Sequence, residues 1–177
     1  KMDICLIVDE IQTGFGSTGD YWYSKKINID PDILIFGKKS QIFGITTNDK
    51  YSEAINSRFR KLEVTFDGDL IDAIRCNYII DAIEKYDLLN NVKQNSQILK
   101  EELKDIFYNY RSSGHLIAFD FENRNIRDEF VSKAYQKNLL VNPTGERSVR
   151  LRPNLALNKL ELENAINILK EVSSFIN

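Results

Sequence analysis

Residues 6–44 read LIVDEIQTGFGSTGDYWYSKKINIDPDILIFGKKSQIFG and contain two apolar runs that each end abruptly in charged side chains. The first run, residues 4–8, is rich in β-branched residues and predicts a buried parallel strand. It ends at two carboxylates, Asp9 and Glu10, whereas the second run, residues 33–36, ends at a glycine and a lysine pair. Ligands bind outside the carboxyl ends of strands in open α/β sheets. The stretch therefore predicts an active site that combines an acid with an amine.

The composition of the chain is that of a soluble globular protein. Of its 177 residues, 42% are apolar and 28% are charged, values that argue against a disordered or membrane protein. A formal charge of −2 argues against a nucleic-acid-binding surface, and no apolar run approaches the roughly 20 residues that cross a bilayer. The two cysteines, Cys5 and Cys76, give no disulfide framework, so we expect buried thiols and a cytoplasmic protein.

Hydrophobic periodicity predicts an alternating α/β pattern along the chain. The predicted strands cover residues 4–8, 33–36, 43–46, 116–121, 139–142 and 149–152, and the predicted helices cover residues 21–24, 50–57, 70–86, 90–107, 125–138 and 159–176. The two central helices contain no proline, so they are expected to form one long helix or two nearly continuous ones.

The chain enters its first predicted strand within a few residues of Lys1. A lone parallel strand at that position needs other strands to pair with. We therefore expect this sequence to be the C-terminal portion of a longer protein.

The residues at the ends of the first two strands suit a site for a carbonyl cofactor. Asp9 could face a protonated heterocyclic nitrogen, because a nearby opposite charge favours the charged form of a base. Its alternative role is to cap a loop or to pair with Lys38. Lys38 could form a Schiff base and then move a proton, although lysine doublets on loops are more often solvated. Asp9 lies 29 positions earlier, at the other end of one strand-helix-strand unit. This combination favours the interpretation of Lys38 as a Schiff-base lysine.

Two further candidates lie in the second half of the sequence. Arg150 and Arg152 alternate on a predicted strand and so point to one side. Arginine can bind a carboxylate through two parallel hydrogen bonds, but two solvated arginines are the alternative interpretation. His115 is the only histidine, and we expect a structural role for it. No second histidine or cysteine pair accompanies it, so no metal site is predicted.

The runs VDEIQTGFGSTGDYW (residues 8–22) and PDILIFGKK (residues 31–39) resemble the signature of the class III (ω-amino acid) aminotransferases, which are pyridoxal-phosphate enzymes. Three further matches follow in the order typical of that family, so that the resemblance covers essentially the whole chain: Val64-Thr65-Phe66, residues 114–121, and NPTG followed by VRLRP within residues 142–153.

This resemblance implies an α/β fold, the fold type I (aspartate aminotransferase-like) of pyridoxal-phosphate-dependent transferases. Residues 1–72 would be the C-terminal part of the large cofactor-binding domain. Residues 73–110 would form a long interdomain helical segment, and residues 111–177 the C-terminal small α/β domain.

The resemblance also implies a role for each matching site residue. Asp9 would pair with the pyridine nitrogen and keep it protonated, and Gln12 would bind near the phenolic oxygen of the cofactor. Lys38 would form the Schiff base and then move the substrate proton. Thr65 would bind the phosphate of the cofactor in the neighbouring subunit, which implies a homodimer with shared active sites. Arg150 would hold the α-carboxylate of an amino acid or of 2-oxoglutarate.

Lys38 is preferred to Lys39 because it directly follows the small residue of the family motif. Within the family, residues 36–44 are most similar to lysine 6-aminotransferases. This similarity implies transfer of the terminal amino group of L-lysine to 2-oxoglutarate, giving 2-aminoadipate 6-semialdehyde and glutamate. The alternatives are 4-aminobutyrate, ornithine or diaminobutyrate as donor, or a non-catalytic remnant. The phosphate-binding glycine-serine loop of the family has no match here, so this chain alone is expected to be inactive.

Overall fold

A computed structural model of the chain describes residues 4–56 and 68–175 and confirms the mixed α/β architecture. The chain divides into two compact units. Lys1–Gly16 and Asp20–Asp87 form the first unit, and Ser17–Gly19 with Leu88–Asn177 form the second. The division expected at residues 72 and 110 stays a prediction. None of the helices in the described ranges is long and apolar enough to cross a membrane.

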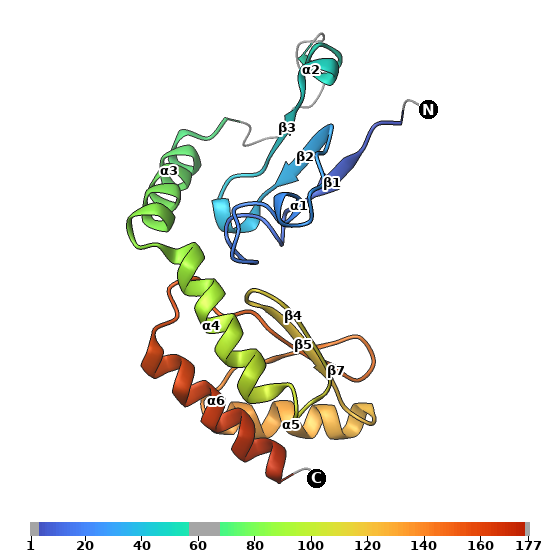
Figure 1. Cartoon of the computed structure of the whole chain (residues 1–177), viewed down its shortest axis with the longest axis vertical. Helices are drawn as coiled ribbons and strands as arrows, with labels where there is room; N and C mark the ends of the chain where they lie inside the picture. Colours follow the sequence, from blue (N-terminus) through green and yellow to red (C-terminus); the bar gives the residue numbers. More distant parts are fainter. Residues whose placement is uncertain (1–3, 57–67, 176–177) are drawn as a thin grey trace. The chain divides into compact units, whose positions relative to one another are not determined.

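The first unit contains a three-stranded sheet of mixed direction (Figure 1). Its strands are β1 (Ile7–Asp9), β2 (Ile33–Phe36) and β3 (Gly44–Thr47), in the order β1-β2-β3. β1 pairs with β2 in parallel, β3 pairs with β2 antiparallel, and Asp9 lies opposite Ile35. The prediction for β2 is confirmed residue for residue. Its apolar run has clear limits in the sequence, because Asp32 precedes it and Gly37 follows it.

The first strand differs from its prediction in position and in burial. It begins at Ile7 rather than at Ile4, and Asp9 is its last residue. The side chains of Ile4, Leu6 and Ile7 are exposed, so the expectation of a buried strand is wrong within the described residues. β1 is an edge strand of this sheet, and the sheet leaves these side chains uncovered.

The helices of the first unit are α1 (Tyr23–Lys26), α2 (Asp49–Asn56), α3 (Leu70–Lys85) and the 3-10 turn η1 (Lys38–Ser40). α3 begins at a capping carboxylate, Asp69, which accepts hydrogen bonds from the backbone N–H groups of Ile71 and Asp72. At its other end the chain takes a left-handed conformation at Asp87, with φ of 48°. This break separates α3 from α4, so the predicted helical segment is two helices.

The second unit packs three helices against one face of an antiparallel four-stranded sheet (Figure 1). The strands, in the order β4-β5-β7-β6, are β4 (Tyr108–Ser113), β5 (Leu116–Asp120), β7 (Ser148–Leu151) and β6 (Asn142–Thr144), and the helices are α4 (Leu88–Leu103), α5 (Arg124–Gln136) and α6 (Lys159–Ser174). Alternate strand residues such as Phe119 and Val149 are buried against the helices. The rings of Phe107 and Phe119 stack 4.0 Å apart at the centre of this core.

Two strands of the second unit depart from the predictions. The strand β4 was not predicted, because its sequence YNYRSS is polar and a β-bulge interrupts its register between Tyr108 and Arg111. The strand predicted over residues 139–142 is wrong, since β6 begins at Asn142 and includes Pro143. β6 lies at the edge of its sheet, where a proline removes no hydrogen bond that the sheet requires.

Candidate active site

Asp9 and Lys38 lie at the carboxyl ends of two neighbouring parallel strands of the first unit. Asp9 ends β1 opposite Ile35 of β2, and Lys38 follows β2 after one glycine. Paired strands run about 4.8 Å apart, so the two residues belong to the same edge of the sheet. Both residues are exposed. The Asp9 carboxylate accepts a hydrogen bond of 2.8 Å from the backbone N–H of Ile11, which fixes it at the turn that follows β1.

The backbone at Lys38 adopts a conformation that side chains seldom accept. Its φ is 57°, in the left-handed region, and non-glycine residues held there cluster at functional sites. The carbonyl of Lys38 accepts a hydrogen bond of 3.0 Å from the backbone N–H of Gln41. Before it, a Cβ atom on Gly37 would lie 2.3 Å from the ring of Phe43. A side chain at position 37 would therefore displace the ring of Phe43, and the turn that follows holds Lys38 in its left-handed conformation.

The neighbouring acid, Glu10, is buried, with 1% of its surface exposed. Burial opposes its ionisation, but hydrogen bonds from the Thr13 hydroxyl and from the backbone N–H groups of Ser24 and Tyr23 outweigh this effect and hold the pKa of Glu10 below its ordinary value. No role for Glu10 follows from the sequence alone. Its partners on α1 lie 13 and 14 positions away, a distance at which no local motif signals the contact.

Arg150 lies in the second unit, on β7, opposite Ala118 of β5 and Asn142 of β6. It lines a cavity of about 270 Å³ together with leucines of α4, α6 and the segment before β6 and with the polar residues Asn142, Arg152 and Asn154. Its Nε atom is buried and, among the described residues, has no hydrogen-bond partner. An unpaired buried donor is costly, and a carboxylate would satisfy it in a charge-assisted bond. Arg152 follows the end of β7 and is exposed.

The remaining predicted site residues have different placements. Gln12 is half-buried in the turn after β1. Thr65 lies outside the described residues, as does the surrounding Val64-Thr65-Phe66 match. His115 is buried at the turn between β4 and β5, and its backbone N–H donates to the carbonyl of Ser17 at 2.8 Å. Across residues 4–56 and 68–175, no group of three or more histidine, cysteine or acidic side chains could hold a metal ion.

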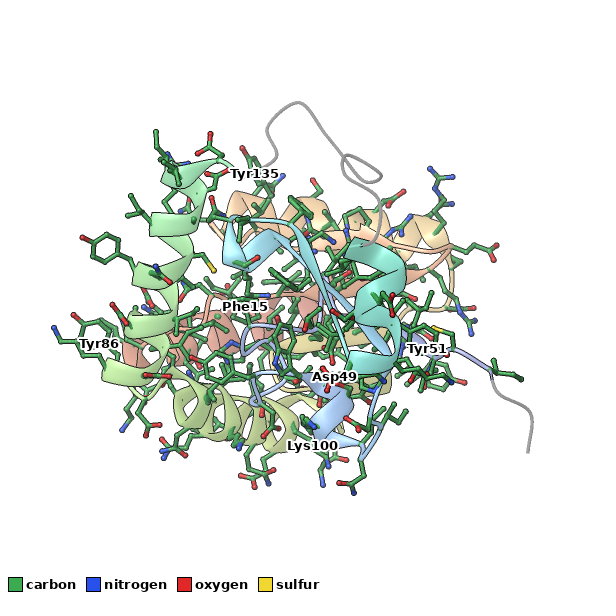
Figure 2. All side chains as sticks on the ribbon, turned by 90° about the horizontal axis from the view of Figure 1, so that it is seen from above. Phe15, Asp49, Tyr51, Tyr86, Lys100 and Tyr135 are labelled. Carbon is green, nitrogen blue, oxygen red and sulfur yellow. The ribbon has the colours of Figure 1, made fainter. Side chains whose placement is uncertain are left out.

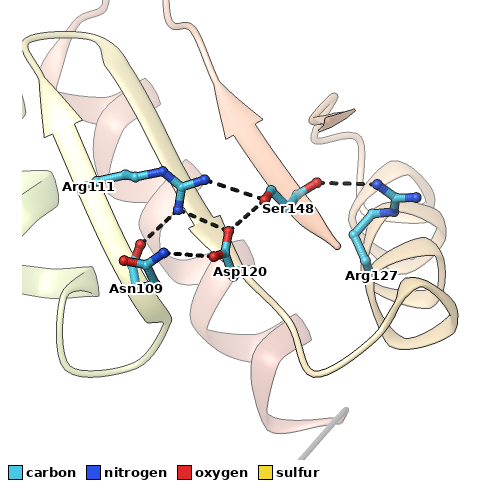
Figure 3. Close-up of polar contacts among 5 residues, drawn as sticks. All are labelled: Asn109, Arg111, Asp120, Arg127 and Ser148. Atoms are coloured by element: carbon cyan, nitrogen blue, oxygen red, sulfur yellow. Dashed lines mark hydrogen bonds and ion pairs between the residues drawn. The ribbon is translucent and has the colours of Figure 1, made fainter. Parts of the chain in front are cut away.

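A polar network that the sequence did not predict joins three strands of the second unit (Figure 3). The carboxylate of Asp120 accepts hydrogen bonds from Arg111 at 2.9 Å, from Ser148 at 2.6 Å and from Asn109 at 2.8 Å. Burial alone would raise the pKa of Asp120, but these bonds and the charge of Arg111 lower it to about 2. The network thus fixes the ends of β4, β5 and β7 around one charged carboxylate.

Comparisons with known proteins give a consistent result. The family model described as "Aminotransferase class-III" matches residues 1–172. The L-lysine-epsilon aminotransferase of Mycobacterium bovis is 31% identical over 176 residues, which cover 94% of this chain and 39% of that protein. A 4-aminobutyrate aminotransferase of Dictyostelium discoideum is 33% identical over 176 residues, which cover 94% of this chain and 35% of that protein.

Among solved structures, the lysine aminotransferase from M. tuberculosis in the internal aldimine form superposes with a TM-score of 0.91 at 29% identity. The match covers 99% of this chain and 42% of that structure. The chain therefore spans about two fifths of the length of these proteins, and its described fold is found within theirs.

Proposed function

Because this chain belongs to the class III aminotransferases, a family of pyridoxal-phosphate-dependent enzymes, we propose that it supplies part of the active site of a transaminase. The reaction that we propose moves the terminal amino group of L-lysine to 2-oxoglutarate and produces 2-aminoadipate 6-semialdehyde and glutamate. The similarity to L-lysine-epsilon aminotransferases supports this substrate. The comparable identity to a 4-aminobutyrate aminotransferase keeps 4-aminobutyrate, ornithine and diaminobutyrate as alternative donors.

The single observation that carries the proposal is the position of Asp9 and Lys38 at the ends of adjacent parallel strands. Pyridoxal phosphate supplies an aldehyde that binds an amine and a ring that takes up electrons. A carboxylate and an amine at one sheet edge fit the ring nitrogen and the aldehyde of that group. In this proposal Asp9 holds a proton on the ring nitrogen, because its negative charge stabilises the protonated form.

Lys38 has two tasks in the proposed reaction. Its amine attaches the cofactor covalently, and once released it moves the proton between the substrate carbon and the cofactor carbon. The exposure of Lys38, compared with the half-buried Lys39, supports its choice as the attachment point. Gln12, in the turn after Asp9, would donate a hydrogen bond near the phenolic oxygen, and Thr65 would bind the phosphate of the cofactor in a second subunit.

Arg150 is the proposed receptor for the substrate carboxylate. Its buried Nε atom, which lacks a partner among the described residues, and its place on the wall of a cavity support this role. A guanidinium matches the planar, two-oxygen geometry of a carboxylate. The proposal includes a homodimer, since Thr65 would serve the neighbouring site, and a cytoplasmic location, for which the free thiols of Cys5 and Cys76 are suitable.

The proposal is tested by reducing the whole protein with borohydride in the presence of pyridoxal phosphate and then mapping its peptides. We expect a pyridoxyl group on Lys38, and we expect Lys38→Ala to abolish the labelling while Lys39→Ala retains it. Labelling of Lys39, or none at either lysine, would overturn the assignment. A protein that lacks labelling would instead support a non-catalytic role.

A further inference from the structure

Glu10 and Asp9 are neighbours at the end of β1, and their side chains have opposite environments. Asp9 is exposed, whereas Glu10 is buried with 1% of its surface exposed. Successive side chains of a strand point to opposite faces, so the chain presents one acid to solvent and the other to the interior of the first unit. The carboxylate of Glu10 can therefore accept hydrogen bonds from the loop that joins β1 to α1.

Glu10 forms hydrogen bonds to this loop, to α1 and to β2 through its carboxylate, its carbonyl and its N–H. One carboxylate oxygen accepts hydrogen bonds from the Thr13 hydroxyl and from the backbone N–H of Tyr23, and the other accepts from the backbone N–H of Ser24 at 2.6 Å. Its carbonyl accepts from Gly14 at 2.9 Å, and its own N–H donates to Ile35 of β2 at 2.8 Å. One buried residue thus ties the end of β1, the following turn and the start of α1 together.

Aromatic packing also holds the same loop. The ring of Phe15, which is buried and is labelled in Figure 2, lies 5.3 Å from that of Trp22 and 6.0 Å from that of Phe36. Trp22 comes so close to the chain that a Cβ atom on Gly14 would lie 2.7 Å from its ring. Phe36 ends β2, two positions before Lys38. The loop held by Glu10 therefore packs on the strand that carries the proposed attachment lysine.

We propose that Glu10 is a positioning residue for the cofactor site, which it serves by fixing the turn that orients Asp9. The Asp9 carboxylate is held at its place by the backbone N–H of Ile11, and Ile11 belongs to the turn that Glu10 braces through Thr13 and Gly14. Removal of the brace lets the turn move, and the Asp9 carboxylate then loses its alignment with the ring nitrogen. This inference rests on the proposed function, because it needs Asp9 to face the cofactor.

The lowered pKa of Glu10 agrees with this role. Hydrogen bonds outweigh burial and stabilise the ionised form, so the carboxylate acts as an acceptor for all three donors at neutral pH. Glutamine at this position keeps the shape of the side chain but offers a single acceptor oxygen. Its amide nitrogen would face a backbone N–H group of α1. The replacement therefore weakens the brace without removing the side chain.

The test compares variants of the whole protein by two measurements that do not depend on turnover. The first is the dissociation constant for pyridoxal phosphate added to the apoprotein, and the second is the visible circular dichroism band of the bound cofactor, which reports the orientation of its ring. Glu10→Gln should raise the dissociation constant, by up to about 10-fold if the value of one bond to a charged group is lost from the cofactor-bound state alone, and should weaken the band. Asp9→Asn should change both quantities in the same direction.

Matched variants separate positioning from a purely structural effect. Thr13→Val removes one donor to Glu10 and should give a smaller change of the same kind, whereas Thr13→Ser retains the hydroxyl and should behave as the unaltered protein. Glu53→Gln makes the same chemical change at an exposed position of α2 and should change neither measurement. Thr13→Val also keeps the inference testable if Glu10→Gln does not fold.

The inference is overturned if Glu10→Gln or Thr13→Val lowers the melting temperature but leaves the dissociation constant and the band unchanged, while Asp9→Asn changes both. That result would make Glu10 a structural residue and leave the proposed function standing. If Asp9→Asn itself changes neither quantity, the proposed role of Asp9 is wrong, and the role of Glu10 is wrong with it.

Discussion

The backbone of Thr18 occupies the space that a side chain at Gly114 would need. A Cβ atom built on Gly114 would lie 2.5 Å from the Cα atom of Thr18 and 2.6 Å from the carbonyl oxygen of Ser17. The next residue, His115, donates its backbone N–H to the same carbonyl at 2.8 Å. The β4–β5 turn and the segment Ser17–Gly19 thus contact each other through backbone atoms, within one compact unit.

This contact predicts that Gly114→Ala is more damaging than the same change at another turn glycine. Both Gly114 and Gly145 have positive φ, at 59° and 53°, so both replacements carry a backbone cost of about 1–2 kcal/mol. Only Gly114 meets neighbouring atoms, because nothing lies within 4 Å of a Cβ on Gly145. Overpacking adds about 1–3 kcal/mol. Denaturant unfolding of the two variants measures the difference, and equal losses would contradict the close contact.

Replacement of Asp120 by asparagine should destabilise the protein in a pH-dependent way. The pKa of Asp120 is lowered from 3.8 to about 2 in the folded state, so its charged form stabilises the fold above the unfolded pKa of about 4 and this stabilisation is lost as the pH falls towards 2. The shift corresponds to about 2 kcal/mol at neutral pH. Unfolding free energies of the two proteins should therefore converge between pH 4 and pH 2.

The control for this experiment is Asp105→Asn, at an exposed acid before β4. Its unfolding free energy should follow that of the unaltered protein across the same pH range. A constant difference between Asp120→Asn and the unaltered protein at all pH values would show that the charge of Asp120 is not the source of the effect.

The aromatic core of the second unit makes Phe119 a sensitive position. Its side chain is fully buried and stacks on Phe107 with an interplanar angle of 21°. Phe119→Ala should lower the unfolding free energy by about 3–5 kcal/mol, because the change removes apolar contact and leaves a cavity. Tyr135→Ala, at an aromatic residue of α5 that is 69% exposed, should have a much smaller effect in the same thermal or denaturant measurement.

Arg150→Ala should weaken substrate binding while sparing the cofactor. A bond from a charged donor is worth about 1.5–3 kcal/mol, which corresponds to an increase of about 10- to 100-fold in KM for 2-oxoglutarate. The affinity for pyridoxal phosphate should change little. Steady-state kinetics and cofactor titration of the whole protein measure the two effects, with Arg147→Ala, at an exposed position, as the control. An unchanged KM would show that Arg150 does not bind the carboxylate of 2-oxoglutarate.

Local signals made part of this structure predictable from the sequence. The strand Ile33–Phe36 was predicted to the residue, since its apolar run lies between Asp32 and Gly37. The helices were predicted to within a few residues by their periodicity and the absence of proline. The placement of Asp9 and Lys38 at the ends of two neighbouring strands was also predictable, because Asp9 follows its apolar run directly and Lys38 follows its run after one glycine.

The parts that were missed depend on contacts between distant residues. The strand β4 has no apolar alternation, and pairing with β5 gives it its conformation. The network around Asp120 joins residues that are 9 to 37 positions apart. The hydrogen bond from Ser24, at the start of α1, to Glu10 likewise forms only when the loop folds back towards the end of β1. No short sequence motif predicts such partners, so they are found only in the three-dimensional structure.

The assignment of Ser17–Gly19 to the second unit has a consequence for dividing this protein. The boundary between the units is crossed three times along the chain, after Gly16, after Gly19 and after Asp87. A polypeptide of residues 88–177 would therefore be an interrupted unit, whose β4–β5 turn has lost the backbone that fills it. A single protease cut after Asp87 would leave Ser17–Gly19 on the N-terminal fragment. The two fragments could then separate only after the contact between Thr18 and Gly114 is broken.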